Sequence, residues 1–314
     1  MTNTRDGRRP GSNEGRLAVG TGRASAHHGE LLQGVFEGAD GQLHRGLITL
    51  PCPLFTSTAT FWPRPGSGIT TRPAGRDKAS RAATLTLERL GLPQIGGELT
   101  IESTVPMGHG YGSSTADVVA AIRATAAAAR IALRQETVAA LAVAAETASD
   151  PLAYEGLPVL FSQREGLLLE LLGPAFPPLI IVGCNVAPDR PVDTLLTSPA
   201  RYGSDEIETF RVLSGLARHA VAAGDARLLA SVATASAQIS QRHLPKPHFD
   251  KLSDIARGTG ACGLQVAHSG TLVGLLFDGA QSHARRRAAE AASELAAYGL
   301  SSVITYELGV EGMP

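Results

Sequence analysis

Several residue types are scarce in this 314-residue sequence, and each shortage narrows the class of protein. The three cysteines, Cys52, Cys184 and Cys262, lie far apart, are odd in number and form no Cys-x-x-Cys pair. This pattern indicates neither a disulfide framework nor a zinc site, and it favours buried thiols in a reducing cytoplasm. The first twenty residues are polar and contain no apolar run that could act as a signal peptide or membrane anchor.

The chain also carries almost no net charge. The formal charge is −1 with a near-neutral isoelectric point, so the chain as a whole offers no electrostatic surface for nucleic acid or an anionic membrane. We expect a small-molecule partner, and we leave a homodimer open. Apolar residues make up 43% of the chain and charged residues 18%, as in ordinary globular proteins.

The order of patterns along the chain predicts an α+β fold. We expect a disordered tail at 1–15, an amino-terminal domain at 16–175 and a carboxy-terminal domain at 176–314, because Gly173-Pro174 and Pro177-Pro178 mark a linker. After residue 16 we expect glycine turns mixed with short strands, and a loop at 63–77. Further strands are predicted at 47–62, 97–105, within 156–172, and at 179–186, 263–266, 271–277 and 302–307. Helices are predicted in an alanine-rich stretch that ends at 133, and at 79–90, 136–147, 204–223, 226–240, 248–257 and 282–298.

A glycine-rich segment, Met107-Gly-His-Gly-Tyr-Gly-Ser-Ser, joins a predicted strand to the alanine-rich helix. Such a turn presents several backbone N–H groups and the positive end of the helix dipole to one point, which favours phosphate binding. The hydroxyls of Ser113, Ser114 and Thr115 can bind phosphate oxygens or Mg²⁺. The segment matches neither a P-loop nor a dinucleotide-binding turn. A structural alternative is a capping box formed by Ser114 and Asp117.

Three segments resemble motifs of one enzyme family. Pro106-Met-Gly-His-Gly-Tyr-Gly-Ser-Ser-Thr-Ala-Asp resembles the second motif of the GHMP kinases, with Tyr111 in place of leucine and Thr115 in place of a small residue. Ala26-His-His-Gly-Glu-Leu-Leu-Gln-Gly resembles the first motif of the bacterial L-threonine kinases of cobalamin synthesis, although His28 stands where cysteine is expected. Ala267-His-Ser-Gly-Thr-Leu-Val-Gly-Leu resembles the third motif of that branch.

The resemblance implies the GHMP kinase fold: an amino-terminal domain like domain 2 of ribosomal protein S5, a ferredoxin-like carboxy-terminal domain, and an active site between them. It also implies an ATP-dependent kinase that uses Mg²⁺ and phosphorylates the hydroxyl of L-threonine. The implied ATP-binding residues are Pro106, Gly108, His109, Gly110, Tyr111, Gly112, Ser113, Ser114 and Thr115.

Two acidic residues receive roles from the same resemblance. Glu146 corresponds to the family's Mg²⁺-coordinating glutamate, with Ser114 as a second ligand. Asp150 lies in the turn where many of these kinases keep a catalytic aspartate, which takes the proton of the acceptor hydroxyl or orients that hydroxyl. The structural alternatives are a helix-end glutamate bonded to a neighbouring side chain, and an Asp-Pro turn that caps the local backbone.

Residues of the first and third motifs are candidates for binding the acceptor. Glu30 and Gln33 are chosen because a free amino acid carries an ammonium group that a carboxylate can pair with. We place His28 in the same pocket, and expect Ser269 and Gly270 to shape a turn near the acceptor or the phosphates. Glu30 as a structural carboxylate and the histidines as ordinary loop residues stay open. The role of a polar stretch at 243–248 also stays open: it either reaches the active-site cleft or is only a loop between two helices.

Other functions stay open beside the threonine kinase. One is a GHMP kinase acting on a different hydroxy amino acid, amino alcohol or amino sugar. Another is an inactive homologue that binds a nucleotide or metabolite, although the presence of Ser114, Glu146 and Asp150 favours an active enzyme. A serine hydrolase is disfavoured, because Gly110-Tyr-Gly-Ser-Ser does not match Gly-x-Ser-x-Gly.

Overall fold

The computed structural model describes residues 17–190, 200–300 and 302–309. The tail expected at 1–15 lies outside the described residues. Within the described ranges, ten strands form one sheet in the order β10-β7-β9-β8-β1-β2-β4-β3, and β5 pairs with β2 and β6. The strands are β1 (Gly20–Glu37), β2 (Leu43–Pro65), β3 (Ile69–Arg72), β4 (Ile95–Ser103), β5 (Val159–Ser162), β6 (Leu167–Leu171), β7 (Leu179–Asn185), β8 (Gly263–Val266), β9 (Leu272–Asp278) and β10 (Ile304–Leu308).

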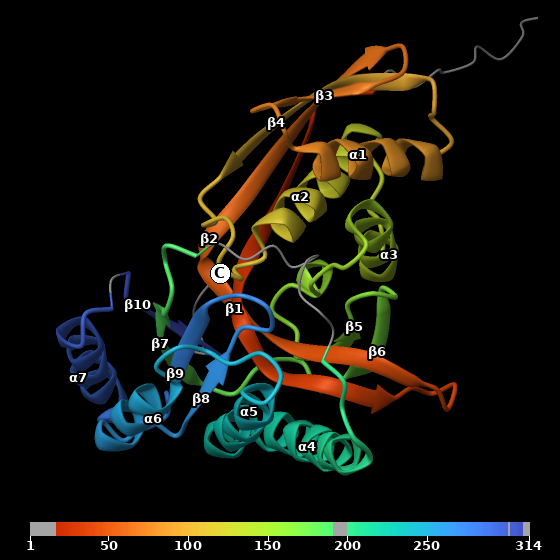
Figure 1. Ribbon diagram of the computed structural model, residues 1–314. Coiled ribbons are helices and arrows are strands. Elements are labelled where there is room, and N and C mark those ends of the chain that lie inside the picture. The colour runs from red at the N-terminus through yellow and green to blue at the C-terminus, as the bar shows by residue number, and fades with distance from the viewer. Residues whose placement is uncertain (1–16, 191–199, 301, 310–314) are drawn as a thin grey trace, which may run out of the picture.

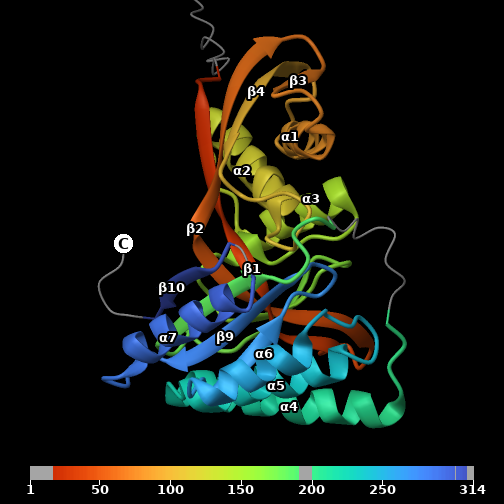
Figure 2. The same cartoon turned by 60° about the vertical axis from the view of Figure 1, so that its left-hand side comes forward.

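Helices cover this sheet in two groups (Figures 1 and 2). The helices are α1 (Asp77–Arg89), α2 (Ser113–Ala128), α3 (Gln135–Glu146), α4 (Ser204–Ala223), α5 (Ala226–Ser240), α6 (Phe249–Gly258) and α7 (Ala284–Ala297), with a short 3₁₀ turn η1 (Leu152–Tyr154). Helix α2 packs on β1 and β2 with α1 and α3 beside it, while α5, α6 and α7 pack against β7, β8 and β9. The predicted α+β fold is confirmed.

The long strands β1 and β2 are the main departure from the sequence predictions. Short strands and glycine turns were expected after residue 16, but β1 is continuous over 18 residues and pairs antiparallel with β2. The predicted loop at 63–77 also contains the short strand β3, which pairs in parallel with β4. Register shifts interrupt the β1–β2 ladder between His27 and Glu30 and between Glu30 and Leu32. These bulges bend the strand where the first motif lies.

The alanine-rich helix α2 approaches β1 unusually closely. A Cβ added to Gly22 would lie 2.4 Å from the carbonyl oxygen of Ala120 and 2.4 Å from the backbone nitrogen of Ala124. Because these are backbone atoms of the helix, only glycine on the strand permits this spacing. The predicted helix to residue 133 ends earlier, at Ala128, where the chain turns through Arg130 with positive φ.

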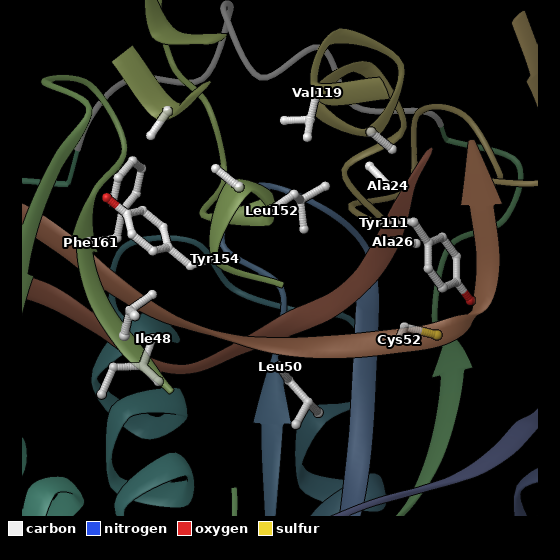
Figure 3. Packing of buried hydrophobic residues seen from close by; sticks show 14 of the residues in the cluster. Ala24, Ala26, Ile48, Leu50, Cys52, Tyr111, Val119, Leu152, Tyr154 and Phe161 are labelled. Atoms are coloured by element: carbon white, nitrogen blue, oxygen red, sulfur yellow. The ribbon is translucent and has the colours of Figure 1, made fainter. Parts of the chain in front are cut away.

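A buried apolar cluster fixes the segments that carry the first two motifs (Figure 3). Leu152 and Tyr154 of η1 are buried, and the ring of Tyr154 packs 5.8 Å from that of Phe161. Figure 3 also shows Tyr111 directed toward Cys52 on β2. Because η1 follows Asp150 directly, its packing holds the turn that carries this aspartate.

The sheet continues across the predicted domain boundary. Strand β1 pairs with β2 on one side and, through Glu30 and Val266, with β8 on the other. The division at 175/176 stays a prediction. Among the described residues, no helix is long and apolar enough to cross a membrane.

Candidate active site

The glycine-rich loop leads directly into the amino terminus of α2, as the sequence predicts. Gly108, Gly110 and Gly112 have φ values of 81°, 99° and 71°, which glycine adopts without steric cost. Gly112 is the residue before the helix and has no side chain to cap it. The first N–H groups of α2 are therefore available to an anion at the positive end of the helix dipole.

The capping-box alternative for this helix start is wrong. The carboxylate of Asp117 accepts a hydrogen bond of 2.6 Å from Ser57 Oγ and lies 2.9 Å from the guanidinium of Arg76. Ser114 directs its hydroxyl to Glu146 instead. Neither side chain thus satisfies the helix amino terminus.

The turn at 267–271 lies against this loop. The backbone N–H of Thr271 donates to the carbonyl oxygen of His109, with an N–O distance of 2.9 Å. A Cβ on Gly270 would lie 2.3 Å from that oxygen, so this approach requires glycine at 270. Ser269 and Gly270, which the sequence places near the phosphates or the acceptor, are thereby next to the glycine-rich loop.

Ser114, Thr115 and Glu146 form a hydrogen-bonded group at the start of α2. Ser114 Oγ donates to Glu146 Oε2 and Thr115 Oγ1 donates to Glu146 Oε1, each over 2.7 Å. Burial raises the pKa of Glu146, although the two hydroxyls favour its charged form. The Nζ atom of Lys78 lies 4.0 Å from Oε2. The predicted ligands Ser114 and Glu146 are therefore in contact. A buried carboxylate beside hydroxyl oxygens is a donor set that suits Mg²⁺.

Asp150 lies next to this group and is paired with His27. Its Oδ2 atom is 3.0 Å from His27 Nε2 and 3.4 Å from Thr115 Oγ1. Burial alone would raise the pKa of Asp150, but the charge and hydrogen bond of His27 bring it below its ordinary value. Burial alone would lower the pKa of His27, but Asp150 and Glu30 raise it to about 9. At neutral pH the pair is therefore a carboxylate and an imidazolium.

Glu30 lies on the other side of His27. Its Oε1 atom is 3.9 Å from His27 Nδ1, and its side chain is 2% exposed. Burial raises the pKa of Glu30 to about 7, and the charge of His27 opposes this rise. Within the described part of the chain, its Oε2 atom is buried and has no hydrogen-bond partner. An unpartnered buried carboxylate oxygen is costly, and a cationic ligand would remove that cost.

His27, Glu30 and Asp150 also have the spacing of a metal site. Each offers a ligand atom, and these atoms lie within 4.8 Å of one another. A histidine that ligates a metal must be neutral, whereas the raised pKa of His27 favours its protonated form. A metal ion at this cluster would therefore have to displace the proton of His27.

His28 lies apart from Asp150. Its Nδ1 atom is 2.7 Å from Gln265 Nε2, and its ring centroid lies 5.6 Å from that of Tyr111 and 6.2 Å from that of Tyr306. Burial lowers the pKa of His28 to about 3, so the ring is neutral. Successive strand residues point to opposite faces, which explains why only one of the two histidines meets Asp150. Acceptor binding by His28 stays a prediction.

Gln33 faces the same side of the sheet as Glu30. Directly paired residues of antiparallel strands share a face, and Gln33 pairs with Leu47 while Glu30 pairs with Thr49, two residues farther along β2. The backbone N–H of Gln33 donates to Ser236 Oγ over 3.0 Å. In the described residues, neither polar atom of its buried side chain has a partner.

Sequence reasoning did not assign a role to three basic residues of this site, His27, Lys246 and His268. The side chain of His27 was only one of two adjacent histidines in the first motif. Lys246 lies in the polar stretch at 243–248, and its ammonium donates to the carbonyl oxygen of His268 over 2.8 Å. This bond ties the stretch to the third motif. The rarity of lysine, three in the whole chain, was the available signal.

Comparisons with known proteins agree with this arrangement. A family model described as the GHMP kinases N terminal domain matches residues 77–154. An L-threonine kinase of Salmonella typhimurium is 28% identical over 277 residues, which are 83% of this chain and 83% of that protein. An L-threonine kinase of Citrobacter freundii is 30% identical over 193 residues, 57% of this chain and 62% of that protein.

A solved structure supports the fold. The homoserine kinase of Cytophaga hutchinsonii superposes with a TM-score of 0.66 at 16% identity, covering 96% of this chain and 98% of that one. The predicted GHMP kinase fold is therefore confirmed. The match to the GHMP kinases N terminal domain and the similarity to two kinases identify an ATP-dependent small-molecule kinase with the GHMP kinase fold.

Proposed function

We propose that this kinase transfers the γ-phosphoryl group of ATP to the hydroxyl of L-threonine and gives L-threonine O-3-phosphate. The observation that carries the proposal is the position of Asp150, between His27 and the start of α2. An acceptor hydroxyl held there faces a phosphate bound at the glycine-rich loop. The similarity to two L-threonine kinases supports the choice of acceptor, and the first and third motifs support a place for the product in cobalamin synthesis.

The phosphate side is assigned to the glycine-rich loop. The N–H groups at the start of α2, with the helix dipole, would bind the phosphates. Ser113, Ser114 and Thr115 add hydroxyls beside them. The ATP-binding roles of Pro106 and of the loop residues up to Thr115 are part of this proposal.

Mg²⁺ fits beside the same loop. Ser114 and Glu146 would hold it, because the buried Glu146 carboxylate and the Ser114 hydroxyl are hard oxygen donors in contact with each other. When bound, the ion supplies positive charge that stabilises the phosphoryl oxygens. Glu146 has a raised pKa through burial, and a cation beside it would favour its charged form.

Asp150 would orient the acceptor hydroxyl. Phosphoryl transfer passes through a loose transition state, so positioning contributes much of the acceleration. A carboxylate whose pKa lies below its ordinary value is a weak base, and the charge of His27 keeps Asp150 in this state. Asp150 therefore accepts a hydrogen bond from the hydroxyl and receives its proton late in the transfer.

The test is ADP release with MgATP against L-threonine, L-serine, L-homoserine, amino alcohols and amino sugars. Turnover that is fastest with L-threonine would support the proposal. Turnover only with another acceptor would overturn the substrate but not the kinase assignment.

A further inference from the structure

Lys246 is a buried lysine in the segment that joins α5 to α6. Its side chain is among the buried charged groups, with 8% of the residue exposed. The backbone N–H of Lys246 donates to Gln241 Oε1 over 2.7 Å, which fixes this part of the segment. The ammonium group is therefore held in a defined place and is largely removed from water.

The ammonium group has too few partners for its burial. Three N–H donors are available on an ammonium, and the structure gives Nζ the carbonyl oxygen of His268 at 2.8 Å. Among the described residues, no carboxylate lies within 4.0 Å of Nζ. Burial lowers the pKa of Lys246 to about 8, and the charge of Glu30 opposes this fall. A buried cation without a counterion is costly.

Glu30 and Lys246 lie at the same end of β8. Glu30 pairs with Val266, the last residue of β8, and Lys246 bonds to His268, two residues farther along the chain. Each charge affects the pKa of the other residue, yet the two groups do not form an ion pair. An anion and a cation thus lie on segments that meet at this end of β8, close enough to influence each other, and each lacks a full set of partners.

The region between them is polar and close to Asp150. The side-chain amide of Gln33, which shares the face of Glu30, is buried and lacks a partner in the described residues. His27 lies between Glu30 and Asp150: its Nε2 atom is hydrogen-bonded to Asp150 over 3.0 Å, and its Nδ1 atom lies 3.9 Å from Glu30 Oε1. A small ligand with an ammonium, a carboxylate and a hydroxyl would match these groups.

We propose that Lys246 binds the carboxylate of the acceptor while Glu30 binds its ammonium, so that the pocket selects hydroxy α-amino acids over amino alcohols. This inference rests on the proposed function for the direction of the hydroxyl toward Asp150. Two arginines, Arg45 and Arg164, are also close enough to lower the pKa of His268, so they are the other candidate partners for an acceptor carboxylate. Arg164 is exposed, and Arg45 already donates to the carbonyl oxygen of Ala200 over 2.6 Å. Lys246 is thus the best placed of these three cations.

The experiment measures KM and kcat for matched acceptors with wild-type enzyme and with Lys246→Met. The matched pairs are L-threonine with L-threoninamide and L-homoserine with L-homoserinamide, together with 1-amino-2-propanol. Lys246→Met should raise the KM for the carboxylate acceptor about 100-fold, as expected for loss of one partner of a buried charge pair. The KM for the amide should change by less than about threefold, and kcat for both should change little.

The ratio of the two KM values is measured on one preparation, so a partly unfolded variant does not distort it. Lys246→Arg keeps the positive charge and should retain most of the preference for the carboxylate, although a planar guanidinium replaces the compact ammonium. Lys251→Met, which changes an exposed lysine five residues away, should leave both KM values unchanged.

The outcomes separate this inference from the proposed substrate. Equal losses on the acid and the amide would overturn the role of Lys246 and leave L-threonine as the acceptor. A carboxylate-specific loss with L-homoserine, in an enzyme that does not use L-threonine, would support Lys246 and overturn the proposed substrate. Wild-type turnover restricted to acceptors without a carboxylate would overturn both.

Discussion

The two sides of the candidate active site differ in how their polar groups are satisfied. On the proposed phosphate side, Ser114 and Thr115 both donate to Glu146, and the helix dipole supplies positive potential. In the described residues, His109 Nδ1 is the buried polar atom of the loop at 106–112 that has no partner. On the acceptor side, Glu30 and Gln33 keep buried polar atoms without a partner in the described residues, and the ammonium of Lys246 has one hydrogen-bond acceptor.

The difference suggests that the phosphate side is preorganised before substrates bind, whereas the acceptor side is completed by its ligand. A preformed anion site suits a phosphate, whose chemistry is the same in every turnover. Buried groups without partners make binding depend on the acceptor, because a ligand that lacks one charge leaves the opposite charge unpaired. Specificity should therefore reside mainly on the acceptor side.

Asp150 lies where the two sides meet, and its replacement should have the largest effect. Asp150→Asn removes the carboxylate that orients the hydroxyl, so kcat should fall about 1000-fold, within the usual range for a group that handles the proton. ADP release measures this, with Asp254→Asn on the exposed face of α6 as the control. A loss of less than about tenfold would identify Asp150 as a turn residue only.

Replacement of Glu146 tests the proposed phosphate side without changing the acceptor side. Glu146→Gln removes the charge but keeps the size, so kcat/KM should fall about 100-fold and half-maximal activity should need more Mg²⁺. Because burial disfavours the charged form of Glu146, the variant should unfold at or above the wild-type temperature. Glu136→Gln at the exposed start of α3 is the control. An unchanged Mg²⁺ dependence would remove Glu146 from the metal site.

His27 connects the two sides, and its replacement should change the pH dependence more than the rate. The pKa of His27 is raised to about 9, so wild-type kcat at saturating L-threonine should fall as pH rises through about 9 and the positive charge is lost. In His27→Gln that fall should disappear. The pKa of Asp150 should rise without its cationic neighbour, which moves the acid limb of the profile to higher pH.

The expected loss for His27→Gln at neutral pH is about tenfold, since positioning is impaired but Asp150 remains. His219→Gln on the exposed face of α4 provides the comparison. A variant whose pH profile coincides with that of the wild type would show that His27 does not control the charge of Asp150.

Glu30 gives the smallest expected effect, on stability rather than on chemistry. Its folded pKa is about 7 and its ordinary value is 4.5, so the folded state binds more protons between these values. Wild-type stability should then fall as pH rises from about 4.5 to about 7. Glu30→Gln, which has no charge to bury, should be more stable than the wild type above pH 7 by up to about 3 kcal/mol.

Urea unfolding of Glu30→Gln at several pH values measures this difference, with Glu37→Gln at the exposed end of β1 as the control. The advantage of the variant should vanish below about pH 4.5. A variant less stable than the wild type above pH 7 would mean that Glu30 is already well paired inside the protein.

The sequence predicts the phosphate side better than the acceptor side, for a physical reason. The loop at 106–112 and Ser114 are contiguous, and Glu146 and Asp150 lie at the end of a helix whose periodicity is clear. The resemblance to the GHMP kinases implies the roles of these groups, and their short separations in the sequence keep them close together. The helices α4 and α5 likewise have the bounds that their periodicity predicts.

The other features of the site and the sheet depend on contacts between residues that are far apart in the sequence. Strand alternation sends His27 and His28 to opposite faces, but the register shifts in β1 that place His27 beside Asp150 are not visible in any local pattern. Lys246 reaches the third motif across a helix and a strand. The parallel pairing of β3 with β4 is also nonlocal, which explains why this short strand was predicted as a loop.

The most direct test of the account is phosphorus NMR of the product formed from MgATP and L-threonine. We predict a phosphomonoester on the side-chain oxygen of L-threonine, formed together with one equivalent of ADP and about 1000-fold more slowly with Asp150→Asn. An acyl phosphate, a phosphoramidate, or ADP formed without any phosphorylated L-threonine would contradict the placement of the acceptor hydroxyl at Asp150.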